Sequence, residues 1–225
     1  MTQTAQAIDT HTAARFNMIE QQIRTWEVLD PVVLELFNTV PRENFVAESQ
    51  VGLAFADVEL PIGNEQTMLS PKIEGRILHA LNIKKTDKVL LVGTGSGYLT
   101  ALLATLADHV HAVEIQPELS AIAATRLQKQ NIFNVTLHVA DAANGYAPNA
   151  PYDVIVFTGS LQLRPDAAES MLNVGGRLFA VVGDLPIMHA TLTQRVSEDA
   201  FRHETIFETC LPPLENVPQA SKFSF

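Results

Sequence analysis

Residues 88–98 read KVLLVGTGSGY, an apolar run that leads directly into a glycine-rich turn. A continuous apolar run of this length is typical of a strand that is buried on both faces of a sheet. Glycines let the backbone turn sharply and approach a ligand closely, and a helix that starts there presents free N–H groups. The stretch therefore predicts a buried strand, a turn suited to ligand binding and the start of a helix.

The segments around this stretch alternate between helices and short apolar strands. Helical spacing of apolar residues occurs at Ile73, Ile77 and Leu81, at Leu99, Leu102, Leu103 and Leu106, and at Leu119, Ile122, Ala123 and Leu127. Further apolar runs predict strands at 109–115, 134–139 and 153–157. Apolar strands that alternate with helices form a parallel sheet covered on both faces. The sequence thus predicts a doubly wound α/β domain.

The pattern changes after Gly175 and Gly176. Three strand-like runs follow at 177–183, 189–196 and 201–209, separated by short loops. The loop between the last two leaves no room for a crossover helix, so these strands must be antiparallel. The sheet is therefore predicted to end in a hairpin.

The first 60 residues are predicted to be mainly helical. Phe16, Ile19, Ile23 and Trp26 recur at helical spacing, whereas the opening dozen residues, rich in Thr, Gln and Ala, are expected to be disordered. Asp30 before Pro31 is typical of an N-cap followed by proline in the first helical position, and Ser70 before Pro71 repeats this pattern. Each pair predicts the start of a helix.

Composition excludes several classes of protein. The 225 residues fit one domain, and 25 acidic against 15 basic residues give a net charge of −10, which argues against a nucleic-acid partner. No apolar run approaches the roughly 20 residues needed to span a bilayer, and the N-terminus lacks the apolar core of a signal peptide. We therefore expect a soluble cytoplasmic protein without a membrane partner.

Cysteine and histidine do not predict a metal site. Cys210 is the single cysteine, which excludes an internal disulfide and a cysteine-based metal cage, and we expect it to be a small buried side chain. His109 and His111 share one face of a predicted strand, but no third ligand is evident. No metal is therefore expected.

The spacing of the glycines distinguishes between two kinds of ligand. A dinucleotide fingerprint, GxGxxG, needs a small third residue where this chain has Tyr98, so NAD is disfavoured. The observed GxGxG spacing, at Gly93, Gly95 and Gly97, resembles that of Rossmann-like methyltransferases that use S-adenosyl-L-methionine (AdoMet). A turn whose glycines serve shape alone is the alternative interpretation.

Two acidic residues at strand ends favour the AdoMet interpretation. Glu114 closes the second predicted strand, where its carboxylate could accept hydrogen bonds from both ribose hydroxyls, and Asp141 follows the third, near an adenine amino group. Ligands of open α/β sheets bind at this edge. The predicted cofactor site comprises Gly93, Thr94, Gly95, Gly97, Glu114, Ile115, Asp141, Ala142 and Thr158.

From about Arg15 to the C-terminus the chain resembles the protein-L-isoaspartate O-methyltransferase family. The segments that carry the resemblance are QQIR (21–24), VPRENFV (40–46), AFADVELPIG (54–63), EQTMLSP (65–71), VLLVGTGSGY (89–98), VEIQPEL (113–119), PYDVIVFTGS (151–160) and GGRLFAVVG (175–183). The resemblance implies a seven-stranded, mostly parallel sheet with an antiparallel last strand, in one domain over residues 1–225. Residues 1–70 would form a helical cap with an acceptor-side loop, and 71–225 the AdoMet-binding core, ending in a tail that closes over the cofactor.

The resemblance also implies a reaction, the transfer of a methyl group from AdoMet to the carboxylate of an L-isoaspartyl residue in a damaged protein. The family serine of the active site corresponds to Leu69 here, the usual glycine before QT is Glu65, and the acidic residue before the glycine loop is Leu91. Thr67 is the nearest matched hydroxyl. Asp57 is a further candidate for the acceptor cleft, with a turn or cap role as its alternative.

Two alternatives stay open at the level of sequence. One is a methyltransferase of the same fold with another acceptor, suggested by Leu69 and Glu65. The other is a non-catalytic protein that binds AdoMet or its product. Isoaspartyl-containing peptides or proteins are the expected substrate of the first interpretation, and the sequence does not indicate an oligomeric state.

Overall fold

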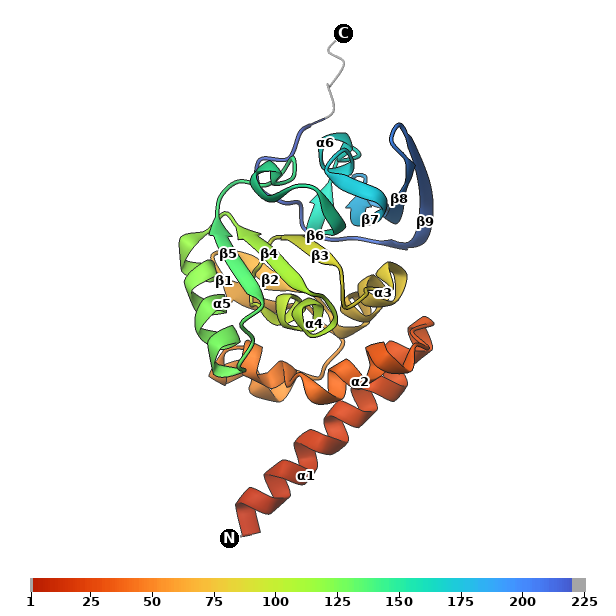
Figure 1. Cartoon of the computed structure of the whole chain (residues 1–225). Coiled ribbons are helices and arrows are strands. Elements are labelled where there is room, and N and C mark those ends of the chain that lie inside the picture. The colour runs from red at the N-terminus through yellow and green to blue at the C-terminus, as the bar shows by residue number, and fades with distance from the viewer. Residues whose placement is uncertain (1, 220–225) are drawn as a thin grey trace.

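A seven-stranded sheet forms the centre of the computed structural model, which describes residues 2–219, with side chains from Thr10 onward (Figure 1). Its order is β5-β4-β3-β6-β7-β8-β9. The strands are β3 (Lys88–Val92), β4 (His109–Glu114), β5 (Val135–Val139), β6 (Tyr152–Leu161), β7 (Leu172–Val182), β8 (Met188–Ser197) and β9 (Ala200–Thr209). Every strand predicted from the sequence is present, within a few residues at its ends except for β6 and β7, which extend further.

Strand direction agrees with the predicted topology. The strands from β5 to β7 pair in parallel, and the two pairings at the other end, β7 with β8 and β8 with β9, are antiparallel. Because β8 opposes both of its neighbours, β9 returns to the direction of β7. The predicted terminal hairpin is therefore confirmed.

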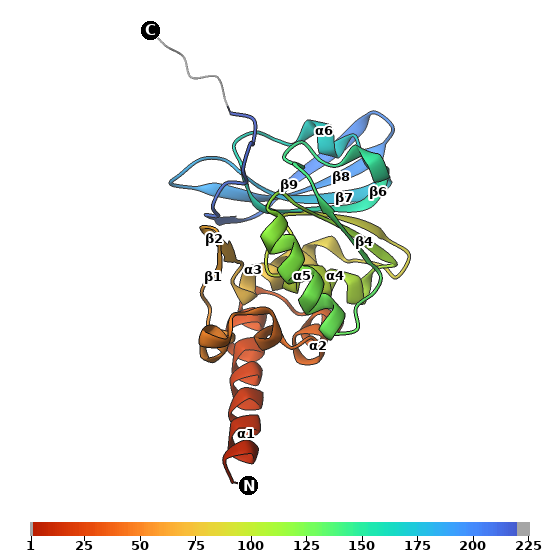
Figure 2. The same cartoon turned by 90° about the vertical axis from the view of Figure 1, so that its left-hand side faces the viewer.

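The helices cover the two faces of the sheet unequally. They are α1 (Thr2–Asn17), α2 (Pro31–Thr39), α3 (Pro71–Leu81), α4 (Tyr98–Leu106), α5 (Pro117–Lys129) and α6 (Asp166–Glu169). Val89 and Leu91 of β3 belong to a large buried cluster with side chains of α2, α3 and α4, whereas Leu90 and Val92 belong to a second cluster with Ala168 of α6. Figure 2 shows α3 and α4 on one side of the sheet and the short α6 on the other. The second face is thus covered mostly by connecting segments rather than by helices.

The N-terminal segment departs from a regular α-helix. Met18–Ile23 is a π-helical segment, followed by a 3₁₀ turn at Arg24–Trp26. Ile19 and Ile23 are buried, but Phe16 is 62% exposed. A wider helical turn changes the angle between successive residues, so the predicted apolar stripe splits between core and surface.

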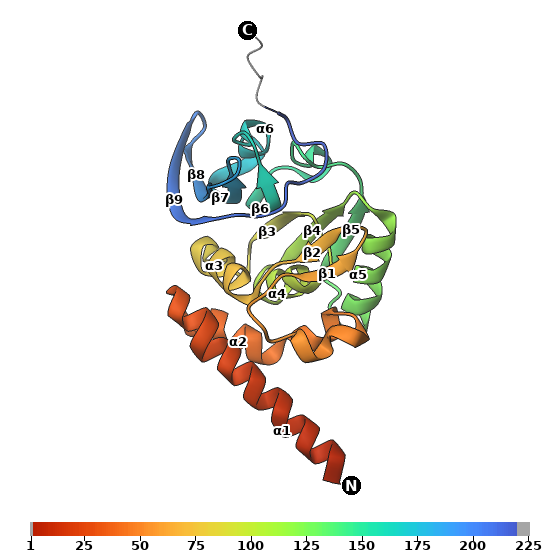
Figure 3. The same ribbon diagram turned by 180° about the vertical axis from the view of Figure 1, so that it is seen from behind.

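The structure shows a helix in the N-terminal segment that was expected to be disordered. Residues Thr2–Asn17 form α1, which projects away from the sheet (Figure 3). The helix runs directly into the buried segment at Met18–Ile23. Extending a helix from an anchored turn is far less costly than starting one, which accounts for its continuation toward the N-terminus.

Both predicted helix starts are found, with different capping. The Asp30 side chain accepts a hydrogen bond from the Val32 N–H at 2.8 Å, and Pro31 opens α2. Ser70 and Pro71 occupy the same positions in α3, but within the described chain the Ser70 side chain makes no capping hydrogen bond. Ser70 therefore holds the predicted N-cap position without the predicted side-chain hydrogen bond, and the fixed backbone angle of Pro71 is the feature that favours a start there.

Cys210 is exposed rather than buried. It follows β9, the edge strand of the sheet, where no further strand covers it. Its Sγ lies 3.1 Å from the carbonyl oxygen of Pro186. The expected buried role of this thiol is wrong because the sheet ends at β9.

Candidate active site

A cleft lies at the carboxyl ends of β3, β4 and β5, the edge at which open α/β sheets bind ligands. Its empty volume is about 570 Å³, which includes space that is open to solvent. We call it the main cleft. Predicted cofactor residues that line it are Gly93, Gly95, Glu114, Ile115, Asp141, Ala142 and Thr158.

The glycine loop forms the floor of the main cleft. Gly93 and Gly95 have φ angles of +89° and +54°, which side chains rarely adopt. A Cβ atom at Gly93 would overlap the hydroxyl of Thr158, and one at Gly95 would lie 3.1 Å from Ile62. Thr158 Oγ1 in turn donates to the carbonyl oxygens of Val92 and Gly93 at 3.1 and 3.0 Å. The loop therefore depends on glycine both for its shape and for the space above it.

Gly97, which was also predicted as a cofactor residue, packs against α5. It precedes α4 with φ +86°, and an added Cβ atom would lie 3.3 Å from the Cα atom of Ala123 in α5. It is a packing residue outside the main cleft. Tyr98 is fully buried beside Phe45, and its hydroxyl donates to the Val40 carbonyl oxygen at 3.3 Å. The bulky residue that disfavoured a dinucleotide site thus fills the space beneath the loop.

Glu114 is fixed in place by backbone N–H groups. Its Oε2 accepts from Gly95 at 2.8 Å and its Oε1 from Gln116 at 3.1 Å, and the residue is 5% exposed. Each carboxylate oxygen has a second lone pair, so both remain able to accept from a pair of hydroxyls. The carboxylate is therefore oriented before any ligand arrives.

Asp141 lies at the exposed rim of the main cleft. Its Oδ1 accepts from the Ala143 N–H at 3.0 Å, and its Oδ2 accepts from the side-chain amide of Asn216 at 2.9 Å. One oxygen is thus held by its own loop and the other by the C-terminal tail.

The tail crosses the mouth of the main cleft. Leu214 and Glu215 line it, and an added Cβ atom at Gly159 would lie 2.8 Å from the Leu214 side chain. Glu215 Oε1 accepts from the side-chain amides of Gln116 at 2.6 Å and Gln66 at 3.5 Å. The tail thus joins the cofactor side to the opposite wall, and its closing over the cofactor stays a prediction; residues 220–225 lie outside the described residues.

A small hairpin forms the opposite wall. Its strands are β1 (Leu60–Gly63) and β2 (Gln66–Met68), and both residues of the turn between them, Asn64 and Glu65, have positive φ angles of 51° and 60°. Thr67 lines the main cleft, and its hydroxyl donates to the Glu59 carboxylate at 3.0 Å. The structure therefore places Thr67, the predicted acceptor-side hydroxyl, in the wall that faces the predicted cofactor residues.

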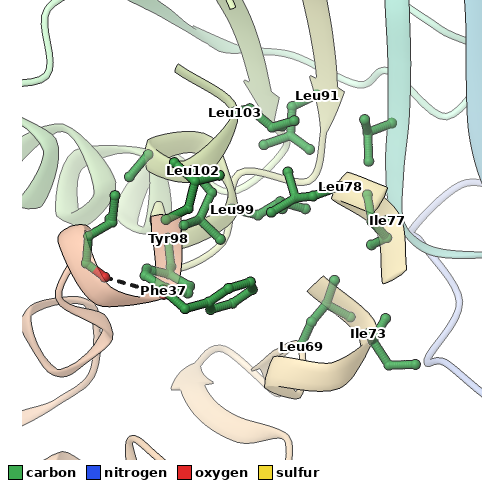
Figure 4. Packing of buried hydrophobic residues seen from close by; sticks show 14 of the residues in the cluster. Phe37, Leu69, Ile73, Ile77, Leu78, Leu91, Tyr98, Leu99, Leu102 and Leu103 are labelled. Atoms are coloured by element: carbon green, nitrogen blue, oxygen red, sulfur yellow. Dashed lines mark hydrogen bonds between the residues drawn. The ribbon is translucent and has the colours of Figure 1, made fainter. Parts of the chain in front are cut away.

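Leu69 turns its side chain into the core. It is 7% exposed and lies beside Ile73 in the buried cluster that Figure 4 shows. Its carbonyl oxygen accepts from Arg42 Nη2 at 2.5 Å, and Arg42 also forms a buried ion pair with Glu74. The position of the family serine is thus a packing position whose backbone is held by an arginine.

Asp57 lies outside the main cleft. Its carboxylate pairs with Lys72 Nζ at 2.7 Å, at the start of α3. Lys72 also lies over the ring of Trp26, at 4.7 Å from its centroid. These contacts give Asp57 a role in joining the N-terminal segment to α3 rather than in the cleft.

A second pocket, the inner pocket, adjoins the main cleft. Its lining residues are Thr67, Met68, Leu69, Glu74, Gly93, Thr94, Gly95, Ser96, Leu99 and Thr158. Thr94, predicted as a cofactor residue, therefore lies here, and Glu74 is a residue that the sequence analysis missed. Burial raises the pKa of Glu74 to about 7, although the neighbouring Arg42 lowers it. The sequence contained one sign of this role, because Glu74 is an acidic residue beside Ile73 and Ile77 on the apolar face of the predicted helix.

His138 of β5 lies beside His109 and His111 of β4. His111 Nδ1 lies 3.2 Å from His138 Nε2 of β5, and the ring of His109 lies 4.9 Å from that of His111. Burial, followed by the positive field of His109, lowers the pKa of His111 to about 4. In the described part of the chain, no group of three or more His, Cys, Asp or Glu side chains could hold a metal ion.

Sequence comparison assigns the family. The family model described as protein-L-isoaspartate (D-aspartate) O-methyltransferase matches residues 13–215. The chain belongs to this family. Curated proteins named protein-L-isoaspartate O-methyltransferase are 38% identical in Syntrophus aciditrophicus, over 85% of this chain and 88% of the relative, and 38% identical in Protochlamydia amoebophila, over 88% and 94%. As a family member, the chain is an AdoMet-dependent carboxyl methyltransferase.

Solved structures agree on the fold. A protein-L-isoaspartate O-methyltransferase superposes with a TM-score of 0.77 over 92% of this chain and 66% of that chain, at 22% identity. A putative family member from Plasmodium falciparum, in complex with S-adenosyl-L-homocysteine, superposes with a TM-score of 0.75 over 91% and 98%, at 17% identity. The predicted Rossmann-like fold is confirmed. The family assignment favours neither a methyltransferase with another acceptor nor a non-catalytic protein.

Proposed function

We propose that Glu114 and Asp141 hold the adenosine of AdoMet in the main cleft, while Thr67 and the backbone of Gln66–Leu69 receive the acceptor carboxylate. The reaction itself, methylation of L-isoaspartyl residues in damaged proteins, follows from the family. One observation carries the residue assignment. The glycine loop, both carboxylates and Thr67 all line the same cleft, from opposite walls.

The cleft fits the cofactor in shape and in chemistry. A side chain at Gly93 or Gly95 would press against Thr158 or Ile62, both of which line the cleft, so glycine keeps the loop open to a ligand. The Glu114 carboxylate suits a ribose diol, and the rim position of Asp141 suits an exocyclic amino group, once Asn216 gives up its hydrogen bond. Bound there, AdoMet supplies an electrophilic methyl group on a sulfonium.

The chemical demand on the acceptor side is modest. The nucleophile is a carboxylate that is already ionised at neutral pH, so no strong general base is needed. The chain must remove water from this carboxylate and align it with the methyl group, and alignment alone can contribute several kcal/mol. The hydroxyl of Thr67 is suited to this task once it gives up its hydrogen bond to Glu59, because it lies on a β-strand that faces the cofactor side of the cleft.

Methyl transfer to matched peptides tests the assignment. We expect labelled AdoMet to transfer its methyl group to an isoaspartyl peptide and not to the aspartyl peptide of the same sequence. Absence of isoaspartyl-dependent label in the wild-type protein would contradict the proposal.

Leu69→Ser and Leu69→Ala separate the chemistry at this position from its packing. Both substitutions remove the same buried contacts, at a cost to stability of ~2–5 kcal/mol for the alanine, but only one introduces a hydroxyl. If Thr67 and the backbone serve the acceptor, both folded variants should have similar kcat/KM values. Activity that appears only in Leu69→Ser would instead place the chemistry at the family serine position.

The expected partners are proteins or peptides that contain isoaspartyl residues. The free thiol of Cys210 is compatible with the reducing cytoplasm that we propose as the location. Among the helices of residues 2–219, none has the length and apolar character required to span a bilayer. Fractionation of cells, with detection of the protein by antibody, tests the location.

A further inference from the structure

The inner pocket continues the main cleft on the acceptor side of the glycine loop. The two share Thr67, Gly93, Gly95 and Thr158 as lining residues. Glu114 and Asp141, the proposed adenosine-binding carboxylates, line the main cleft but not the inner pocket. A ligand that extends from them past Gly95 therefore reaches the inner pocket with the end that is opposite its adenine.

The inner pocket contains a buried polar atom that lacks a partner. Thr94 is 4% exposed, and its Oγ1 has no hydrogen-bond partner among the described residues. Leaving a buried hydroxyl unpaired costs ~1–3 kcal/mol, so native structures rarely do so without a ligand or water at the site. The unpaired hydroxyl thus points to a polar occupant of this pocket.

The inner pocket also contains a carboxylate whose charge is incompletely balanced. Glu74 is 1% exposed, and its Oε2 pairs with Arg42, which also donates to the Leu69 carbonyl oxygen. Despite this partner, burial still raises the pKa of Glu74 to about 7. A single guanidinium therefore does not offset the desolvation of this carboxylate, and a second positive group in the pocket would favour its ionised form.

We propose that Glu74 binds the ammonium group at the amino-acid end of AdoMet, with the Thr94 hydroxyl as a second polar contact. This inference rests on the AdoMet-dependent function of the main cleft. Leu91 lies just before the glycine loop, so the strand offers no carboxylate of its own at that point. Helix α3 supplies one from the other side of the loop.

Ligands that differ in the amino-acid end test this assignment. Titration calorimetry would measure the Kd of S-adenosyl-L-homocysteine and of 5′-methylthioadenosine, which lacks that end, for the wild-type protein and for Glu74→Gln. We expect the variant to bind S-adenosyl-L-homocysteine about 10-fold to 100-fold more weakly, because a charge-assisted hydrogen bond is worth ~1.5–3 kcal/mol. The affinity for 5′-methylthioadenosine should stay within about twofold. Thr94→Val should show the same selectivity with a smaller loss.

Glu118→Gln is the matched control, because Glu118 is an exposed glutamate in the first turn of α5 and should alter neither affinity. Removing one partner of a buried ion pair can unfold a protein, so Glu74→Asp, which keeps the charge but withdraws the carboxylate, is the second variant. It should show the same selective loss.

Two results would overturn the inference. Equal losses for both ligands, or no loss for either, would show that Glu74 only supports Arg42 and the hairpin. Failure of the wild-type protein to bind S-adenosyl-L-homocysteine would overturn the cofactor assignment together with the inference, and is therefore distinguishable from the first result.

Discussion

The two walls of the main cleft are built differently. On the cofactor side, the functional groups stand at the ends of parallel strands and are held by backbone hydrogen bonds, as the two N–H groups on Glu114 illustrate. On the acceptor side, a two-stranded hairpin presents Thr67, whose hydroxyl is held by the side chain of Glu59. Backbone N–H groups therefore fix Glu114, whereas a side chain fixes the hydroxyl of Thr67.

This difference explains which predictions succeeded. Strand ends in a parallel sheet meet at one edge whatever their side chains are, so positions such as Glu114 and Asp141 follow from the order of the strands. A side chain near a hairpin takes its direction from its tertiary partners. Asp57 forms an ion pair with Lys72, and Leu69 packs in the core. The predictions below test how far this contrast holds.

Gly93→Ala should have the largest effect. A Cβ atom would overlap the Thr158 hydroxyl, and φ is +89°, so the loop must move or the side chain of Thr158 must give up its bonds. We expect a loss of at least ~1–2 kcal/mol from the backbone alone, together with loss of detectable cofactor affinity. Thermal unfolding and calorimetry measure the two effects. Gly52→Ala, where nothing lies within 4 Å of an added Cβ atom, should alter neither, and equal behaviour of the two variants would contradict the assigned role of Gly93.

Glu114→Ala should weaken the affinity for S-adenosyl-L-homocysteine about 100-fold. The carboxylate orders the loop through Gly95 and Gln116 and is expected to bind the ribose, and each charge-assisted hydrogen bond is worth ~1.5–3 kcal/mol. Calorimetry measures the Kd. Glu118→Ala, four residues away and exposed, serves as the control. A Glu114→Ala protein that binds normally would show that the cofactor wall does not depend on this carboxylate.

The ion pair behind the hairpin should make stability depend on pH. Burial raises the pKa of Glu74 from 4.5 to about 7, so between these values the folded state holds a proton that the unfolded state has lost. The free energy of unfolding should therefore fall as pH rises from about 4.5 to 7, by at most about 3 kcal/mol from this group. Denaturant unfolding of the wild-type protein and of Glu74→Gln at several pH values measures it. The difference between the two proteins isolates Glu74, and a difference independent of pH would contradict the raised pKa.

Thr67→Val should lower kcat/KM for an isoaspartyl peptide about tenfold, because one hydrogen bond of about 1–1.5 kcal/mol to the acceptor is lost while the shape is kept. The Kd of S-adenosyl-L-homocysteine should change little. Steady-state kinetics and calorimetry separate these effects. Thr191→Val, on the distant strand β8, is the control. If Thr67→Val weakened only the cofactor, Thr67 would belong to the cofactor wall.

Glu65→Gly should have the smallest effect. Glu65 has a φ angle of +60°, a conformation that costs about 1–2 kcal/mol for a residue with a Cβ atom, but glycine also gains entropy in the unfolded chain. We expect a net stabilisation of up to ~1 kcal/mol with unchanged kcat/KM. Thermal unfolding measures the change. Asn64→Gly should stabilise less, because asparagine tolerates this conformation better, and the reverse order would contradict the explanation.

Much of the molecule was predictable because it depends on periodic patterns. The strand and helix order, the glycine turn and the terminal hairpin follow from apolar spacing and loop length. The π-helical segment at Met18–Ile23 was not predictable, because it leaves no simple signal in the spacing of apolar residues. This segment changes which side chains face the core. The contact of Glu215 with Gln66 and Gln116, which lie far from it in sequence, was not predictable either.

The sequence by itself determined the sheet, the edge at which a ligand binds, the residues of that edge and the resemblance to a methyltransferase family. These features are local or periodic, so neighbouring residues are sufficient to specify them. Tertiary structure alone decided that Leu69 is a core residue, that Gly97 is a packing residue and that Glu74 lies in a pocket beside Thr94. The physical reason is that the direction and the charge state of a side chain depend on groups that only the folded chain brings into contact.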